Sequence, residues 1–397
     1  MNFLNSIVLF GLGAAVLPLL IHLVSRRRAK DVAFPSIRLL ELMQSDRIRM
    51  LKVKQLIILL LRTLIIVLII LAMLLSFSIG VNDETPAPLA ATGTLKFNAV
   101  LIIGGLGLTI GTIFLSEEVA STVGGKFLGP SVDYTIYMLL SVLISAILWL
   151  IVGSFSGIAL SSTHSLFGSI FGVVITYLIF NPAADPAGAF DTSKLISLVV
   201  GWFVSPLVGF FLTIILYKVI SKLFLKKLKG LNQIENSETI FSWALLIAVF
   251  GVSVYTGANS GEAIGIIYAL VGGNYLSFGG YWVGKVLLGI FAFLGIFIAG
   301  RYVIKNLASQ TTDARPSDGF IIQIVVFIVL FVVTPLGIPI SHSHVIVFCI
   351  IGLNTSKRHE VDYKGLGKMA LFWVLTFPIA AILGGLIYFG FCMNGLI

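Results

Sequence analysis

The chain has 397 residues, of which 58% are hydrophobic and only 11% are charged, whereas soluble globular proteins carry roughly 25% charged residues. This composition excludes a soluble protein, and the long apolar runs predict an all-α polytopic membrane protein rather than a β-barrel of short alternating segments. The net charge of +9 does not indicate nucleic-acid binding, because the basic residues lie mostly between the apolar runs, as they do in cytoplasmic loops.

The N-terminal part begins with a predicted membrane span at residues 3–24, which is followed at once by arginines at positions 26–28. Because basic residues favour the cytoplasmic side, we expect the N-terminus outside and this loop inside. In residues 31–54 apolar and charged, mostly basic, residues alternate, which predicts an amphipathic helix on the cytoplasmic membrane surface. A solvated linker is the alternative. A second span is predicted at residues 55–79.

The rest of the chain consists of apolar segments separated by polar turns. These segments are predicted near residues 97–115, 134–154, 165–181, 194–220, 263–275, 281–304, 319–336, 345–354 and 367–393. Residues 117–133 are rich in Gly and predict an interfacial loop. The stretch 218–232 carries lysines and no acidic residue, so we expect a cytoplasmic linker between two halves there.

Two polar motifs rich in hydroxyls and histidine interrupt the apolar sequence. The first, at residues 157–164, ends in Ser161-Ser162-Thr163-His164, and the second, at residues 337–344, ends in Ser341-His342-Ser343-His344. At membrane depth such groups need partners in the protein or a ligand, because lipid offers none. For the histidines, a structural role at a helix contact is the alternative to an orienting or pH-sensing role.

A second pair of polar motifs places carboxylates beside broken helices. Asn82, Asp83 and Glu84 follow the second span, and Asn259, Ser260 and Glu262 occupy a matching place later in the chain. Broken helices with carboxylates are typical of cation sites in transporters. We therefore predict that Asp83, Glu84 and Glu262 bind a cation, with sodium also reaching Asn82 and Asn259. Ordinary loop carboxylates are the alternative.

The motifs recur with nearly constant spacing, which predicts an internal repeat. Asn82 and Asn259 are 177 positions apart (259 − 82), and His164 and His344 are 180 apart (344 − 164). We assign residues 1–75 to an N-terminal membrane anchor, 76–225 to repeat A, 226–249 to the linker and 250–397 to repeat B. Hydropathy alone leaves parallel and inverted repeats open, because the short segments can be re-entrant.

Four motifs in this order resemble those of the inorganic phosphate transporter (PiT) family, over residues 75–397. They are Gly80-Val81-Asn82-Asp83, Gly257-Ala258-Asn259-Ser260 and the two hydroxyl–histidine motifs. The resemblance implies cation-coupled phosphate symport, with sulfate in at least one branch, and a helical bundle of inverted repeats with discontinuous helices, often as a dimer. Residues 1–75, notably Phe34-Pro35-Ser36-Ile37-Arg38-Leu39-Leu40, resemble the aerotolerance-regulator N-terminal module, which implies a membrane anchor.

A tetrahedral oxyanion needs several hydrogen-bond donors, and hydroxyls, amides and backbone N–H groups at half-helix starts can supply them. The predicted substrate-binding residues are Asn82, Ser161, Ser162, Thr163, Asn259, Ser260, Ser341 and Ser343, with His164, His342 and His344 orienting or sensing pH. The chain departs from the family pattern at Ser260, which replaces an Asp, and at His342, which replaces a Thr. These departures leave sodium and protons open as coupling ions.

We therefore predict a multi-pass secondary transporter of the cell membrane, not an enzyme, that needs no cofactor and carries phosphate by cation symport. Its expected partners are phosphate or sulfate, the lipid bilayer and a second copy of the chain. Sulfate is the alternative substrate, but Asp83 and Glu84 favour phosphate, which has a proton to donate at pH 7. A non-transporting scaffold or sensor is the alternative of another class. The missing carboxylate at Ser260 supports it, and the retained hydroxyl–histidine motifs oppose it.

Overall fold

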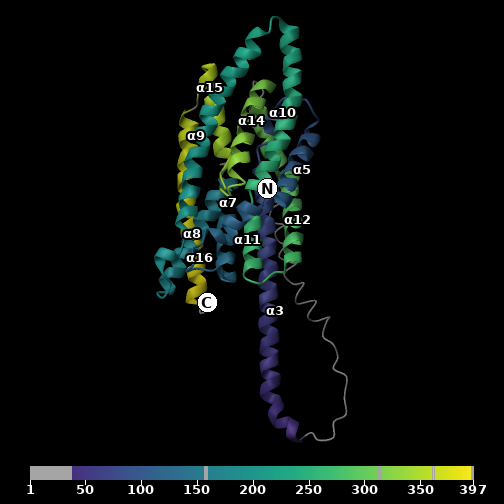
Figure 1. The fold of residues 1–397 in the computed structure, drawn as a ribbon. Helices are drawn as coiled ribbons and strands as arrows, with labels where there is room; N and C mark the ends of the chain where they lie inside the picture. The colour runs from purple at the N-terminus through teal and green to yellow at the C-terminus, as the bar shows by residue number, and fades with distance from the viewer. Residues whose placement is uncertain (1–37, 156–159, 311–314, 360, 362, 395–397) are drawn as a thin grey trace. The chain divides into compact units, whose positions relative to one another are not determined.

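The computed structural model describes residues 38–155, 160–310, 315–359, 361 and 363–394, with helices labelled from α3 (Figure 1). It divides into two compact units, Met1–Leu71 and Ala72–Ile397. The predicted span at residues 3–24, the arginines after it and residues 157–159 of the first hydroxyl–histidine motif lie outside the described residues. Within these described residues, eight helices are long and apolar enough to cross a membrane, which supports the predicted polytopic membrane protein.

The described part of the chain is almost entirely helical. Its first half contains α3 (Arg38–Val81), α4 (Ala87–Ala91), α5 (Phe97–Phe114), α6 (Glu117–Ser121), η1 (Thr122–Lys126), α7 (Ile136–Phe155), α8 (Ser162–Phe180), η2 (Pro186–Gly188), α9 (Thr192–Leu223) and η3 (Leu225–Lys227). Its second half contains α10 (Leu231–Asn259), α11 (Glu262–Gly272), α12 (Phe278–Leu294), η4 (Gly295–Gly300), α13 (Arg301–Gln310), α14 (Pro316–Val333), α15 (His342–Lys357) and α16 (Tyr363–Met393).

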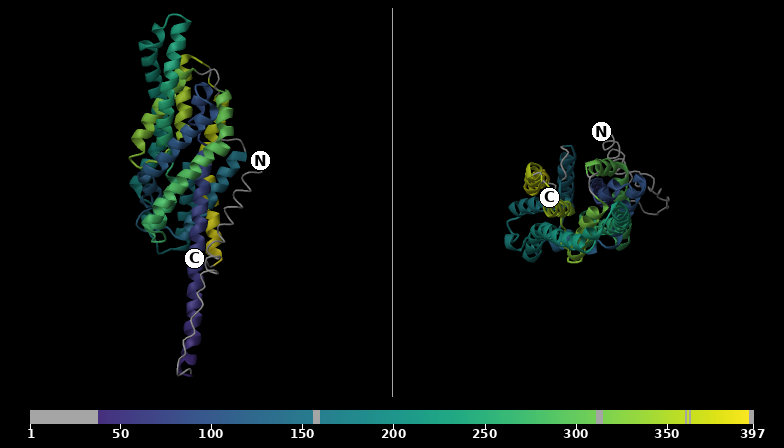
Figure 2. Two further views of the ribbon diagram at one scale, coloured as in Figure 1. Left: turned by 90° about the vertical axis from the view of Figure 1, so that its right-hand side faces the viewer. Right: turned by 90° about the horizontal axis from the view of Figure 1, so that it is seen from above.

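Three predicted boundaries differ from the structure. The amphipathic segment and the second span form one helix, α3, because no Gly or Pro interrupts residues 38–79. Most of the predicted linker at 226–249 is also helical, because it has no breaker after Gly230, so only a short turn separates α9 from α10. Figures 1 and 2 show these two long helices meeting at that turn. The predicted loop at 117–133 begins with two short helices, α6 and η1, whose inner faces are buried.

The two halves place equivalent elements in equivalent contacts. Helix α8 packs along α16, and its equivalent α15 packs along α9. Gly172 and Gly352 lie at matching positions of these pairs, and a Cβ atom at either would come within 2.6 Å or less of a carbonyl oxygen on the partner helix. The close packing of both helix pairs therefore depends on the same glycine in each half.

Two equivalent helices, α5 and α12, also pack against each other. The Thr109 hydroxyl of α5 donates to the Gly289 carbonyl of α12 over 3.0 Å, while Gly105, one turn earlier in α5, lies against Phe293, one turn later in α12. The two helices therefore cross in antiparallel directions. The apolar core beside them joins α10, α14 and α15, with Trp202 of α9 packed against it.

Candidate functional site

The centre of the site is the meeting point of two helix N-termini. Helices α8 and α15 begin at the two hydroxyl–histidine motifs, and the imidazole centroids of His164 and His344 are 5.1 Å apart. Extended backbone at Ser161 and Ser341 forms both N-caps. Helix N-termini offer free N–H groups and a positive dipole end, so their approach creates a region suited to an anion.

In the first motif, His164 is held in place from two sides. Its Nδ1 atom lies 2.7 Å from the Ser161 hydroxyl, which also accepts a hydrogen bond from the His164 backbone N–H. The imidazole packs on the indole of Trp202, with centroids 4.4 Å apart. The Trp202 Nε1–H donates to the carbonyl of Pro339, in the second motif, over 3.0 Å. Trp202 therefore links the two motifs.

The second motif repeats the stacked arrangement with a different hydrogen-bond pattern. His344 packs on Trp373 with ring centroids 3.8 Å apart, but its buried Nε2 atom has no hydrogen-bond partner among the described residues. The Ser341 hydroxyl does not cap α15, in contrast to Ser161 at α8. The backbone N–H groups in the first turn of α15 therefore lack the side-chain hydrogen bond that Ser161 provides in α8.

A carboxylate from the second half reaches the first motif. Glu262 is 1% exposed at the start of α11. Its Oε1 atom accepts a 2.6 Å hydrogen bond from the Thr163 hydroxyl and a longer one, 3.5 Å, from Ser162. Its Oε2 atom is buried and, within the part of the chain that the structure describes, has no partner. One carboxylate oxygen of Glu262 is therefore held by hydrogen bonds, and the other is available to a ligand.

A pair of carboxylates from the first half reaches the second motif in the same way. Asp83 is completely buried, and its Oδ1 atom accepts from the Thr85 N–H over 3.1 Å and lies 3.7 Å from the His342 Nε2 atom. Its Oδ2 atom has no partner among the residues described. Glu84, the next residue, is half-buried, and its Oε1 atom is buried without a partner among the described residues. Each half thus places its acid against the hydroxyl–histidine motif of the other half.

Asn259 makes contacts that its predicted role did not include. Its Nδ2 donates to the Thr334 hydroxyl and the Ile338 carbonyl, each over 3.1 Å, and its Oδ1 accepts from the Ile340 N–H over 2.9 Å. Both amide protons are therefore used, one by Thr334 and one by the second motif, and direct donation to an anion would require a rearrangement. Asn82 and Ser260 lie at matching helix ends, half-buried beside the carboxylates.

Sequence reasoning missed Gln323 and Thr85. Gln323 is completely buried in α14, and its Nε2 donates to the Thr85 carbonyl over 3.1 Å. The Gln323 Oε1 and the Thr85 hydroxyl are both buried without a partner among the described residues. The available signal was a single amide side chain inside an otherwise apolar run at residues 319–333.

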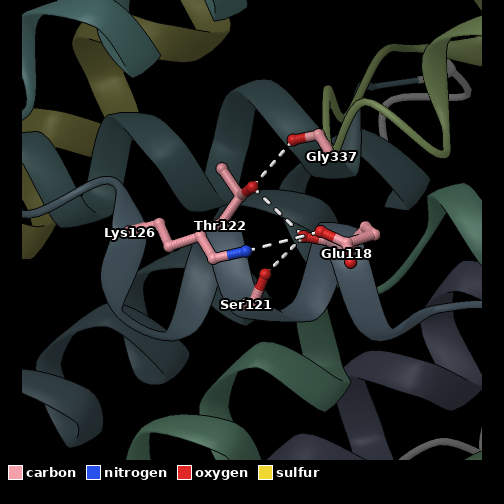
Figure 3. Close-up of polar contacts among 5 residues, drawn as sticks. All are labelled: Glu118, Ser121, Thr122, Lys126 and Gly337. Carbon is pink, nitrogen blue, oxygen red and sulfur yellow. Dashed lines mark hydrogen bonds and ion pairs between the residues drawn. The ribbon is translucent and has the colours of Figure 1, made fainter.

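The short helices α6 and η1 support the beginning of the second motif (Figure 3). The Thr122 hydroxyl donates to the Gly337 carbonyl over 2.8 Å and lies 3.2 Å from the Glu118 carbonyl. Gly337 has a φ of 66°, in the left-handed region that favours glycine. Lys126 and Glu118 form an exposed ion pair at the outer side of the same segment. No cluster of three or more His, Cys, Asp or Glu residues that could hold a metal ion occurs in the described parts of the chain.

Comparisons with known proteins cover both units. The sequence profile of the Phosphate transporter family matches residues 79–384, and the profile named Aerotolerance regulator N-terminal matches residues 1–74. A probable low-affinity inorganic phosphate transporter from Rhizobium meliloti is 28% identical, over 80% of this chain and 93% of its own length. A protein of the same description from Bacillus subtilis is 27% identical, over 81% of this chain and 95% of its own.

A solved structure shares the fold. It is described as the sodium-dependent phosphate transporter, and it superposes with a TM-score of 0.73 at 20% sequence identity, over 83% of this chain and 99% of its own. At that identity the likeness concerns the arrangement of the helices. It supports the helical bundle as an architecture that exists in a solved protein.

Proposed function

The chain belongs to the phosphate transporter family, and on that premise we propose that it carries inorganic phosphate across the cell membrane by symport with a cation, either sodium or a proton. One observation carries the proposal. Asp83 and Glu262 are both buried, and each places an oxygen that no described residue contacts by a hydrogen bond beside the hydroxyl–histidine motif of the opposite half. Carboxylate oxygens that could bind a cation and hydrogen-bond donors that could bind an anion thus lie in one site.

The donors beside the carboxylates suit a tetrahedral oxyanion. Ser162, Thr163, Ser341 and Ser343 supply neutral hydroxyls, and the first turns of α8 and α15 supply backbone N–H groups. Phosphate would displace Glu262 from Thr163, or bind beside it. Neutral donors hold the anion without a fixed positive charge, which keeps the site weak enough for release on the other side.

The carboxylates explain why transport of the anion would need a cation. Phosphate beside two buried acids concentrates negative charge at membrane depth, which is costly without compensation. Sodium is bound by oxygen ligands, and Asp83 and Glu262 have oxygens to offer. A proton on either acid would also remove the repulsion. Entry of cation and phosphate together follows from this charge balance.

The arrangement of the halves suggests how the site could open to either side. The antiparallel crossing of the equivalent helices α5 and α12 supports an inverted repeat, which we propose. Rocking of one half against the other around a fixed central site is the common mode of such transporters. The contacts between each carboxylate and the opposite half would then be remade in each cycle.

Uptake of labelled phosphate into proteoliposomes tests the proposal. Vesicles with the purified chain receive an inward sodium gradient, an inward proton gradient or neither, each with and without excess sulfate. Asp83→Asn and Ser341→Ala are compared with Asp185→Asn and Ser193→Ala, which change exposed residues of the same type. We expect gradient-driven uptake that the first two variants lose and the two controls keep.

The alternatives give different outcomes. Loss of labelled phosphate uptake in excess sulfate, together with gradient-driven uptake of labelled sulfate by the same vesicles, would move the assignment to sulfate. Absence of uptake under every gradient, from native protein that is shown to be folded by a cooperative thermal transition, would reject transport and favour the scaffold or sensor.

A further inference from the structure

A cavity lies away from the central site, between α13, α4 and the start of α5. Its volume is about 520 Å³, and it is lined by Ala90, Phe97, Arg301, Tyr302, Lys305 and Ala308. None of these residues belongs to the four polar motifs, and the proposed transport cycle does not use them.

The cavity is strongly basic for its size. Arg301 and Lys305 are exposed, one turn apart on α13, and the exposed Lys96 directly precedes Phe97 at the N-terminal end of α5. The helices that line the cavity, α4, α5 and α13, contain no acidic residue in their sequences. Positive charge is therefore not compensated within the walls, and an anion would be attracted.

The position of the cavity in the chain points to the edge of the membrane. The apolar span Phe278–Lys305 ends at Lys305, so Arg301 and Lys305 occupy its last turns. Tyr302, between them, is 74% exposed, and Ile298, one turn earlier, is 39% exposed. Basic and aromatic side chains at a span end, next to exposed apolar surface, are typical of the level of lipid headgroups.

The other face of α13 holds the helix in place. Ile304 is completely buried and belongs to an apolar cluster with Ala87 of α4 and Leu101 of α5. The basic face is therefore presented by a packed helix and not by a free tail. A ligand with an anionic phosphate group and an apolar chain would fit both the charge and the exposed apolar surface.

We propose that this cavity binds the headgroup of an anionic phospholipid, with Arg301 and Lys305 contacting the phosphate and Tyr302 at the headgroup level. Free phosphate shares the phosphate chemistry but not the acyl chains. The lipid is favoured because the cavity opens at the end of a membrane span beside exposed Ile298.

Native mass spectrometry and thermal unfolding of the purified full-length chain test the assignment. The chain is titrated in detergent with phosphatidylglycerol, with phosphatidylcholine and, separately, with inorganic phosphate. The double variant Arg301→Gln/Lys305→Gln is compared with Lys126→Gln/Arg358→Gln, which removes the same charge from exposed positions that do not end an apolar span. Equal melting temperatures without added lipid show that both variants fold.

We expect the native chain to retain phosphatidylglycerol in preference to phosphatidylcholine and to be stabilised by it. Because each basic residue near an anionic headgroup is worth about 1 kcal/mol, the cavity variant should bind roughly 30-fold more weakly, and the control should bind as the native chain does. Equal binding of both lipids, or equal loss in both double variants, would overturn the site. Stabilisation by inorganic phosphate that the cavity variant loses, without a lipid effect, would reassign the cavity to free phosphate.

Discussion

At the scale of single residues, Asn259 is a predicted substrate ligand whose side chain hydrogen-bonds to other residues of the site. Two of its three hydrogen bonds hold the backbone on both sides of Pro339, and the third goes to the Thr334 hydroxyl. Replacing it by alanine leaves buried polar groups unsatisfied, so Asn259→Ala should destabilise the protein by about 1 to 3 kcal/mol. The check is the melting temperature of the purified variant. Asn82→Ala, at the equivalent half-buried position, should change it less. An unchanged melting temperature with lost uptake would mean that Asn259 binds substrate directly.

A substitution of Glu262 should change transport but not the stability of the protein. Gln keeps the size of the side chain and can still accept from Thr163, but it cannot carry a negative charge or a proton. Glu262→Gln should therefore lower the initial rate of phosphate uptake by roughly tenfold or more, with the melting temperature unchanged. Glu118→Gln is the matched control, because Glu118 is 56% exposed in its ion pair with Lys126. Native uptake by Glu262→Gln would remove this acid from the cycle.

The polar residues that could be predicted from the sequence are those that occur in clusters. Hydroxyls and histidines around Ser161 and Ser341 stand out because several polar residues follow one another in apolar sequence. Gln323 was missed because a single amide in α14 has no polar neighbour to mark it. The hydrogen bonds of Asn259 to the second motif could not be predicted, because its partners lie about 80 positions away and spacing says nothing about such contacts.

At the scale of elements, the short helix α6 is tied to α12 by a lysine inside a membrane span. The Lys285 ammonium is 3.1 Å from Glu117 Oε2, which also accepts a 2.8 Å hydrogen bond from the Tyr281 hydroxyl. The Lys285 side chain is 2% exposed and that of Glu117 51%. The Lys285 ammonium also lies 5.0 Å from the ring centre of Trp282. This asymmetric pair fixes the segment that supports the second motif through Thr122.

Because only one partner is buried, the two single substitutions should have unequal effects. Glu117→Ala strands a buried ammonium, which is strongly destabilising, whereas Lys285→Met leaves a carboxylate that water can solvate. We expect a clearly lower melting temperature for Glu117→Ala than for Lys285→Met, and recovery in the double variant. If both single variants lowered the melting temperature equally, the loss would come from the broken contact between the two side chains and not from leaving the buried Lys285 ammonium unpaired.

Helix boundaries were harder to predict than helix positions, for a reason visible in α3 and α10. Changes in polarity at residues 54 and 239 suggested ends of elements, but a helix continues through a polar stretch when no Gly or Pro interrupts it. In contrast, the breaks before α8 and α15 were predictable, because Gly157 and Gly337 and the hydroxyl residues after them interrupt apolar runs.

At the scale of the whole second unit, Ala72–Ile397, the directions of equivalent helices indicate whether its two halves are parallel or inverted. A two-fold axis along the membrane normal would leave α5 and α12 parallel, whereas an axis in the membrane plane reverses one of them. The contacts of Thr109 with Gly289 and of Gly105 with Phe293 run in opposite directions along the two helices. This geometry favours inverted halves, a relation that hydropathy left open.

Cysteine labelling in intact cells tests the inverted relation. Ala187, before α9, and His359, before α16, are exposed in equivalent loops, and each is replaced by cysteine in a background with Cys349→Ala and Cys392→Ala. If the lysine-rich turn after α9 is cytoplasmic, as its charge indicates, the 32-residue helix α9 places Ala187 on the outer side. Inverted halves then place His359 inside. A membrane-impermeant maleimide should label the cysteine at 187 from outside and the one at 359 only after permeabilisation, whereas labelling of both from outside would require parallel halves.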